Sequence, residues 1–291
     1  MARQVGPASR GSVLGGPVGL VAAAAAGLVV LLGAATGLEL AGADDGSPTP
    51  PPPASASSAP ASGAPVDPVV VSDCWVPAPG GNVSLTVAEA ERLTDGAARV
   101  SRRGGRASSL VEPVRAATHT TPPVARWVAD ALLGRHGAKG LVCSPVRTSV
   151  DPEKMGRSGL TPRAARLRRA FTTAFGPLPA GGFVSGGVST GHVDNSAHYE
   201  GRAMDVFFRP LGSAEQRRAG WVFAQWVVAH AQRYHVLSAI YSDRIWTSWA
   251  ASLGWRPYQH PGGPTRNPVL RHLDHVHVAV ESGRRFGCGP R

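Results

Sequence analysis

The sequence predicts an α+β fold in which helices flank a small antiparallel sheet. Helical and strand patterns alternate along residues 157–284 with short connections, which is typical of this class. Hydrophobic residues make up 43% of the chain and charged residues 17%, so a buried core is expected and wholesale disorder is excluded. With 291 residues, the chain should hold one or two globular units and accessory segments.

The N-terminal segment indicates export. Residues 11–38 contain no charged side chain, and this run is long enough to cross a bilayer as a helix. Arginines precede the run and acidic residues follow it, which places the N-terminus in the cytoplasm and the remainder outside. We predict that residues 1–43 are either a single-pass membrane anchor or a signal peptide cleaved after the Ala-Gly-Ala at 41–43. The protein would then be held at the cell membrane or, after cleavage, secreted.

Two segments separate this N-terminus from the C-terminal part. Residues 44–72 are rich in Pro, Ala and Ser, and we predict a semi-rigid linker. Residues 73–150 are predicted to form a small helical region. Thr86 and Glu89 have the spacing of a capping box, and a second helical pattern follows Thr121 and ends at Gly134.

The three cysteines suggest one disulfide. Cys74 and Cys143 bracket the small region, and in an oxidising compartment we expect them to pair. Cys288 would then be free or intermolecular, although a different pairing through Cys288 remains open. The sequence contains no CxxC pair that would suggest a structural zinc.

The C-terminal region, residues 157–284, is expected to carry the function, with residues 285–291 as a tail. Thr161 before Pro162 should begin a helix that ends at Gly176, and Ser213 with Gln216 should cap a long amphipathic helix. Strand patterns occur at 183–185, 203–208, 237–241 and 273–280, and a short helical pattern at 245–253.

Two clusters of polar residues interrupt this apolar background. In a strand, alternate side chains share a face, so His275 and His277 should project together. Asp205 is a lone carboxylate within an apolar strand, and its burial would be costly unless it is paired or binds a metal. Gly201 allows the chain to turn sharply and to bring His198 beside that carboxylate.

These residues predict a metal site. His198, Asp205 and His277 would supply two nitrogen ligands and one oxygen ligand, and three protein ligands with a fourth position open are typical of catalytic zinc. Such a site activates water near neutral pH. The alternative is that Asp205 pairs with Arg202 or another arginine, and that the histidines are ordinary surface or core residues.

The pattern SxHxxGxAxD, followed later by HxH, resembles the LAS metallopeptidases. This group is named for lysostaphin, the VanY-type D-alanyl-D-alanine carboxypeptidases and the sonic hedgehog fold. The domain also resembles a C-terminal domain of secreted or membrane-anchored actinobacterial proteins. The matching positions are Ser196, His198, Gly201, Ala203, Asp205, His275 and His277.

The resemblance implies a LAS/hedgehog-like fold and Zn²⁺ bound by His198, Asp205 and His277. It also implies that His275 acts as general base or stabilises the transition state. His272 adds an HxxHxH spacing similar to that of the penicillin-insensitive murein endopeptidases. We predict that the substrate is contacted by Ser196, Arg202 and His272.

Two features differ from the family pattern. VanY-type enzymes carry a substrate-binding arginine before the Ser-x-His motif, and residues 183–192 contain none. No acidic base of the ExxH or ExxW kind is evident either. The missing arginine motivates an alternative function, an inactive LAS-fold module that binds cell-wall polymer or an envelope partner.

The leading prediction is a zinc peptidase of the cell envelope that hydrolyses peptide bonds in peptidoglycan stem peptides or cross-bridges. The net charge of +11 suits an anionic wall, and the N-terminal segment would contact the membrane. Nucleic acid is not an expected partner, because the protein is exported and the sequence contains no helix-turn-helix or aromatic RNA-binding motif.

Overall fold

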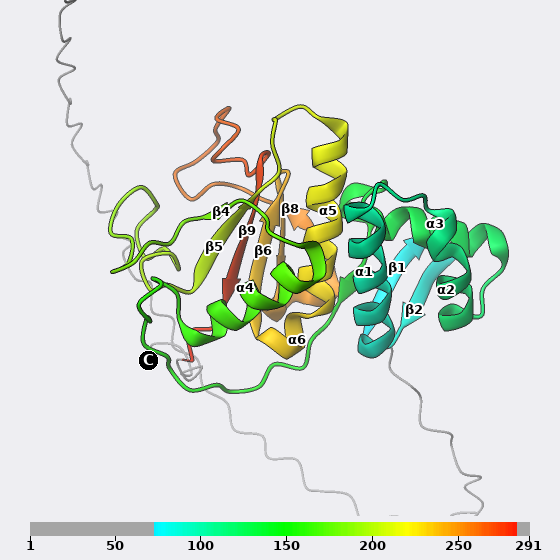
Figure 1. Ribbon diagram of the computed structural model, residues 1–291, viewed down its shortest axis with the longest axis horizontal. Helices are drawn as coiled ribbons and strands as arrows, with labels where there is room; N and C mark the ends of the chain where they lie inside the picture. The colour runs from blue at the N-terminus through cyan, green and yellow to red at the C-terminus, as the bar shows by residue number, and fades with distance from the viewer. Residues whose placement is uncertain (1–72, 284–291) are drawn as a thin grey trace, which may run out of the picture. The chain divides into compact units, whose positions relative to one another are not determined.

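The computed structural model describes residues 73–283 (Figure 1). The predicted anchor or signal at 1–43, the linker at 44–72, the tail at 285–291 and Cys288 lie outside the described residues. Among the residues that are described, no helix combines the length and the apolar character needed to span a bilayer. The described residues belong to one compact unit and share one hydrophobic core.

Residues 73–150 form a small α/β region rather than the wholly helical one predicted. Strands β1 (Cys74–Ala78), β2 (Gly81–Leu85) and β3 (Val142–Cys143) make an antiparallel sheet in the order β2-β1-β3. It is joined by helices α1 (Val87–Arg102), α2 (Ser108–Thr118) and α3 (Pro122–Leu132) and by the 3₁₀ turn η1 (Gly137–Lys139). The prediction omitted the three strands and α2. The strands are short, and α2 contains Pro113, so neither has a strong pattern in the sequence.

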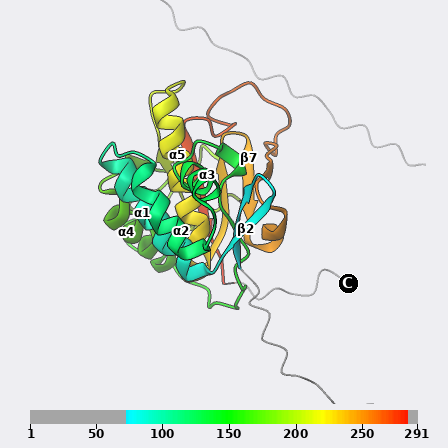
Figure 2. The same cartoon turned by 90° about the vertical axis from the view of Figure 1, so that its right-hand side faces the viewer.

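Local sequence explains how α1 begins and how the small sheet is closed. The backbone N–H of Thr86 donates to Glu89 Oε2 at 2.8 Å, and the Glu89 N–H donates to Thr86 Oγ1 at 3.2 Å, as in a capping box. Cys74 lies opposite Cys143 in the β1–β3 ladder, and the two form a disulfide. Helix α1 packs on α5 (Ala214–Ala229) of the C-terminal region, which Figure 2 shows from the side of α1, α2 and α3.

The C-terminal region is built on a six-stranded antiparallel sheet of order β4-β5-β9-β6-β7-β8. The strands are β4 (Ala180–Gly181), β5 (Ala203–Phe207), β6 (Val236–Tyr241), β7 (Arg244–Thr247), β8 (Arg256–Pro257) and β9 (His275–Val280). The helices are α4 (Pro162–Phe175), α5 (Ala214–Ala229) and α6 (Ala231–Tyr234), with the 3₁₀ segment η2 (Ser248–Leu253). The mixed architecture of antiparallel sheets flanked by helices is therefore confirmed.

Two predicted elements are wrong in detail. The strand expected at 183–185 is displaced to Ala180–Gly181, where it pairs with β5. The helix expected at 245–253 divides into strand β7 and the 3₁₀ segment η2. Ile245 and Trp246 are β-formers that pair with β6, so tertiary pairing outweighs the short helical pattern.

The alternation of side chains along β5 and β9 separates the core from the functional face. Met204 and Val206 of β5 are fully buried, as are Val276 and Val278 of the adjacent strand β9. Helix α5 packs against β6 and β9 and covers this apolar side. Asp205 and its neighbours on the opposite side of β5 and β9 are left to form the site.

Candidate metal centre

Asp205 and His277 face each other across the β5–β9 ladder, in the middle of the sheet. The same register places Phe207 opposite His275. Because the strands are antiparallel and adjacent, a carboxylate and two imidazoles that are far apart in the sequence meet on one face. This register is the reason why two motifs separated by about seventy residues form one site.

His198 reaches the same face from the turn that precedes β5. Gly201 adopts a φ of +65°, and its N–H donates to the His198 carbonyl at 3.0 Å. A side chain at Gly201 would collide with the carbonyl of Gly159, so only glycine fits this position. Ser196 Oγ accepts from the His198 N–H at 3.4 Å and helps to hold the turn.

Three potential ligand atoms form a compact triangle. His277 Nδ1 lies 3.0 Å from both His198 Nε2 and Asp205 Oδ1, and the latter two atoms are 3.4 Å apart. An ion with tetrahedral bonds of about 2.0–2.1 Å would separate its ligand atoms by roughly 3.3 Å. The donor set and its spacing fit a divalent ion, so these three residues could hold a metal. The alternative pairing of Asp205 with Arg202 is not what the structure shows.

The tautomer of His198 suits a ligand role. Its Nδ1 lies 2.8 Å from the carbonyl oxygen of Gly182, to which the Nδ1–H can donate, so the lone pair of Nε2 faces the triangle. Gly182 has a φ of +77°, and a Cβ there would overlap the imidazole of His198 and lie 3.1 Å from Asp205 Oδ2. The backbone at position 182 can therefore lie this close to His198 only because the residue is glycine.

Burial and hydrogen bonding set the charges of the triangle. Burial raises the pKa of Asp205, but the imidazoles of His198 and His277 beside the carboxylate outweigh it and hold the pKa well below its usual range. Burial lowers the pKa of His277, although its hydrogen bond to Asp205 acts in the opposite direction. An ionised carboxylate beside a neutral imidazole is the protonation state that binds a metal.

His275 lies at the edge of the triangle and is oriented by a chain of charged groups. Its Nδ1 is 2.8 Å from Asp274 Oδ1, and its Nε2 is 3.8 Å from Asp205 Oδ1. Arg209 donates through Nε to Asp274 Oδ2 at 2.8 Å. The pKa of Asp274 is lowered because hydrogen bonds from His275 and Arg209 outweigh burial, which raises it. No role for Asp274 or Arg209 is predicted from the sequence, in which the only signal is the aspartate immediately before His275.

The three predicted substrate residues lie in different surroundings. Arg202 donates to Glu200 Oε2 at 2.6 Å and to the Val280 carbonyl at 2.8 Å, so it braces the ends of β5 and β9. The ring of His272 lies 4.8 Å from that of His275, and burial together with the neighbouring His277 lowers its pKa to about 3. The Oγ of Ser196 belongs to the turn described above.

His192 is a further residue of the site, and no role is predicted for it from the sequence. Its ring stacks on His198 with a centroid separation of 3.9 Å and an interplanar angle of 14°. The hydroxyl of Tyr199 accepts from the His192 N–H at 3.0 Å and donates to its carbonyl at 2.7 Å. Tyr199 therefore fixes the loop that places His192 over the ligand His198.

Comparison with known proteins gives a match to a family model. Residues 156–269 match the family model described as "VldE, C-terminal domain". The matched segment contains His198 and Asp205 and ends before β9, which carries His275 and His277. Neither the curated proteins nor the solved structures contain a match to the chain. The chain is thus similar to that family over less than half of its length.

Proposed function

We propose that this chain is a zinc-dependent hydrolase of the cell envelope that cleaves peptide bonds in peptidoglycan stem peptides or cross-bridges. The observation that carries this proposal is the triangle of His198, Asp205 and His277, with the nitrogen of His275 beside it. The motifs shared with the LAS metallopeptidases supply the reaction class and the substrate.

Zinc suits the donor set because imidazole nitrogen and carboxylate oxygen are its ordinary ligands, and catalytic sites use three protein ligands. When bound, zinc supplies Lewis-acid polarisation of a carbonyl group and activation of water. The side chains of the three ligands are 2%, 13% and 14% exposed, so the site is shielded and yet reachable at its rim.

Proton transfer is assigned to His275, which is supported by Asp274 and Arg209. With its Nδ1–H donated to Asp274, His275 keeps a lone pair on Nε2 that faces the site. That nitrogen can accept a proton from the attacking water and return it to the amine leaving group. Asp274 stabilises the imidazolium formed in between, and Arg209 keeps Asp274 ionised.

The location proposed for this activity is the outer side of the cell membrane or the extracellular space. It rests on the uncharged N-terminal segment and the Pro-rich linker that follows it. The net charge of +11 would favour the anionic cell wall over a neutral surface.

The test combines metal analysis with digestion of purified peptidoglycan by the full-length protein. We expect stoichiometric zinc, and mass spectrometry should detect new stem-peptide fragments. His275→Ala should abolish the fragments and retain zinc, because His275 is outside the ligand triangle. His119→Asn, at an exposed helix end, is the control and should behave as wild type. Zinc binding without fragments would support the inactive wall-binding module instead, and absence of both would refute the proposal.

A further inference from the structure

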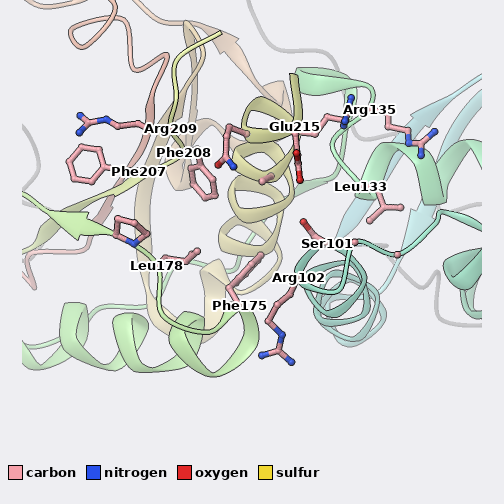
Figure 3. Close-up of a pocket in the computed structure, with 16 residues that line it drawn as sticks. Ser101, Arg102, Leu133, Arg135, Phe175, Leu178, Phe207, Phe208, Arg209 and Glu215 are labelled. Carbon is pink, nitrogen blue, oxygen red and sulfur yellow. The ribbon is translucent and has the colours of Figure 1, made fainter. Parts of the chain in front are cut away.

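A cavity of about 700 Å³ lies apart from the metal centre, and Figure 3 shows the side chains around it. Its walls come from the ends of α1, α3, α4 and β5 and from the first turns of α5. None of the three candidate ligands lines it. Since α1 and α3 belong to residues 73–150, that region contributes one wall of the cavity.

The inner part of the cavity is apolar. Leu133, Phe175 and Phe208 are 8%, 9% and 5% exposed, so their side chains are set in the core and present only an edge to the cavity. The rings of Phe175 and Phe208 lie 5.3 and 5.7 Å from the ring of Phe223, which holds them in place. Leu178 is less buried and lies beside them. An apolar side chain of a ligand could pack here.

The rim of the cavity is basic. Four arginines and a single acidic residue, Glu215, line it. Arg135 is paired with Asp130 at 3.3 Å and Arg209 with Asp274 at 2.7 Å. Arg102 and Arg218 have no acidic partner within residues 73–283, so two guanidinium groups remain available to an anion.

The start of helix α5 adds to this positive character. Ser213 caps the helix, and Glu215 and Gln216 of its first turn line the cavity. The first turn of a helix carries a partial positive charge, which favours anions nearby. The cavity therefore combines an apolar inner wall with two unpaired arginines at its rim, and its volume lies in the range of roughly 300–1,000 Å³ that is usual for ligand pockets.

We propose that this cavity binds an acidic peptide. Its carboxylates pair with Arg102 and Arg218, and an apolar side chain packs against Phe175 and Leu178. Arginine matches a carboxylate through paired N–H donors, which suits this ligand. The carboxylate can belong to an acidic side chain or to the C-terminus of the peptide. The cavity contains none of the three candidate ligands, although Arg209 at its rim also binds Asp274. It gives residues 73–150 a part in ligand binding.

The probe is a fluorescein-labelled peptide of alternating glutamate and leucine with an amidated C-terminus, titrated with the full-length protein by anisotropy. Replacing both free arginines, R102E with R218E, should weaken binding at least tenfold. The matched control, R157E with R169E, changes the net charge equally at exposed arginines outside the cavity and should stay within twofold of wild type. Leu178→Ala should weaken binding several-fold.

Further experiments identify which carboxylate is bound and distinguish binding in the cavity from binding at the metal centre. The amidated probe reports recognition of side-chain carboxylates alone. A leucine peptide whose only carboxylate is its free C-terminus should displace the probe if the cavity recognises that group. His277→Ala should leave binding unchanged, so the result is independent of any hydrolytic activity. The proposal is overturned if the wild type does not bind the probe, if a lysine–leucine peptide binds equally well, or if the control pair weakens binding as much as R102E with R218E.

Discussion

The Nδ1 atom of His275 lies 2.8 Å from Oδ1 of Asp274, the residue immediately before it in the chain. This hydrogen bond directs Nε2 of His275 toward Asp205 Oδ1, 3.8 Å away. The salt bridge from Arg209 to Asp274, at 2.7 Å, keeps the aspartate from turning elsewhere. His275 is thereby held in one orientation and one tautomer before any substrate arrives.

Asp274→Asn tests this arrangement. Asparagine keeps the shape but loses the charge that stabilises the imidazolium and selects the tautomer, so we expect kcat for peptidoglycan hydrolysis to fall by about 10–100-fold. Zinc content should be unchanged, because Asp274 is not a ligand. The control is Asp243→Asn, since Asp243 also pairs with an arginine, Arg271, at 2.6 Å but does not contact His275. An equal loss in both variants would contradict the positioning role.

Gly182→Ala should disrupt the metal centre from the backbone side. A methyl group at Gly182 would overlap His198, so the imidazole must shift away from the triangle, and we expect zinc affinity to fall at least tenfold by competition with a chelator. Gly186→Ala is the matched control. Gly186 also has a positive φ, +84°, but a Cβ there meets nothing within 4 Å. If both substitutions lower the affinity equally, backbone strain rather than the overlap with His198 is the cause.

Asp205→Asn tests the charge of the ligand triangle without changing its shape. A neutral amide is a poor zinc ligand, and the lowered pKa of Asp205, beside the imidazoles of His198 and His277, favours the ionised carboxylate that a metal needs. We expect zinc measured by atomic emission to drop below one tenth of the wild-type content, while circular dichroism stays unchanged. Glu200→Gln, which also neutralises a carboxylate near the turn, should retain zinc. Full zinc content in D205N would remove Asp205 from the ligand set.

His230 predicts how stability depends on pH away from the metal centre. It is 4% exposed and stacks on Trp226 at 4.0 Å, and burial lowers its pKa below the value of about 6.5 expected in the unfolded chain. Between these two pKa values the unfolded chain binds more protons. Stability contributed by neutral His230 is therefore full above pH about 6.5 and is lost as the pH falls below it.

His230→Phe keeps an aromatic ring beside Trp226 but cannot be protonated. Urea unfolding in the presence of a chelator should show a smaller loss of stability between pH 7 and pH 5 than in wild type. Measurements at pH 8 provide the internal control, because there the two proteins should differ only by a constant offset. Parallel curves over the whole range would show that His230 makes no such contribution.

The triangle could be predicted from sequence because period-two alternation assigns faces without knowledge of the partner strand. Asp205 had to lie on the opposite face from Met204 and Val206, and His277 on the opposite face from Val276. Gly201 indicated a sharp turn, and the structure shows it with the positive φ that glycine adopts most readily. These signals are local, and they identify the side chains that meet once the strands pair.

Other parts of the site depend on contacts that no local pattern encodes. Arg209 follows β5 and Asp274 precedes β9, so their salt bridge exists only because β5 and β9 are neighbours in the sheet. The stacking of His192 on His198 depends on the path of a loop held by Tyr199. Arg202, for which a substrate contact is predicted, donates to the backbone carbonyl of Val280 on the neighbouring strand.

Removal of the Cys74–Cys143 disulfide should destabilise the small sheet more than any single surface change. The bond joins β1 to β3 and closes a loop with a sequence separation of 69. In the chain-entropy model, opening a loop of this size frees unfolded-state entropy worth about 4 kcal/mol. We expect the double variant C74A with C143A to lose stability of this order in urea unfolding under oxidising conditions. Cys288→Ala is the control and should retain the disulfide and its stability. A double variant as stable as wild type would mean that β1 and β3 are held by packing alone.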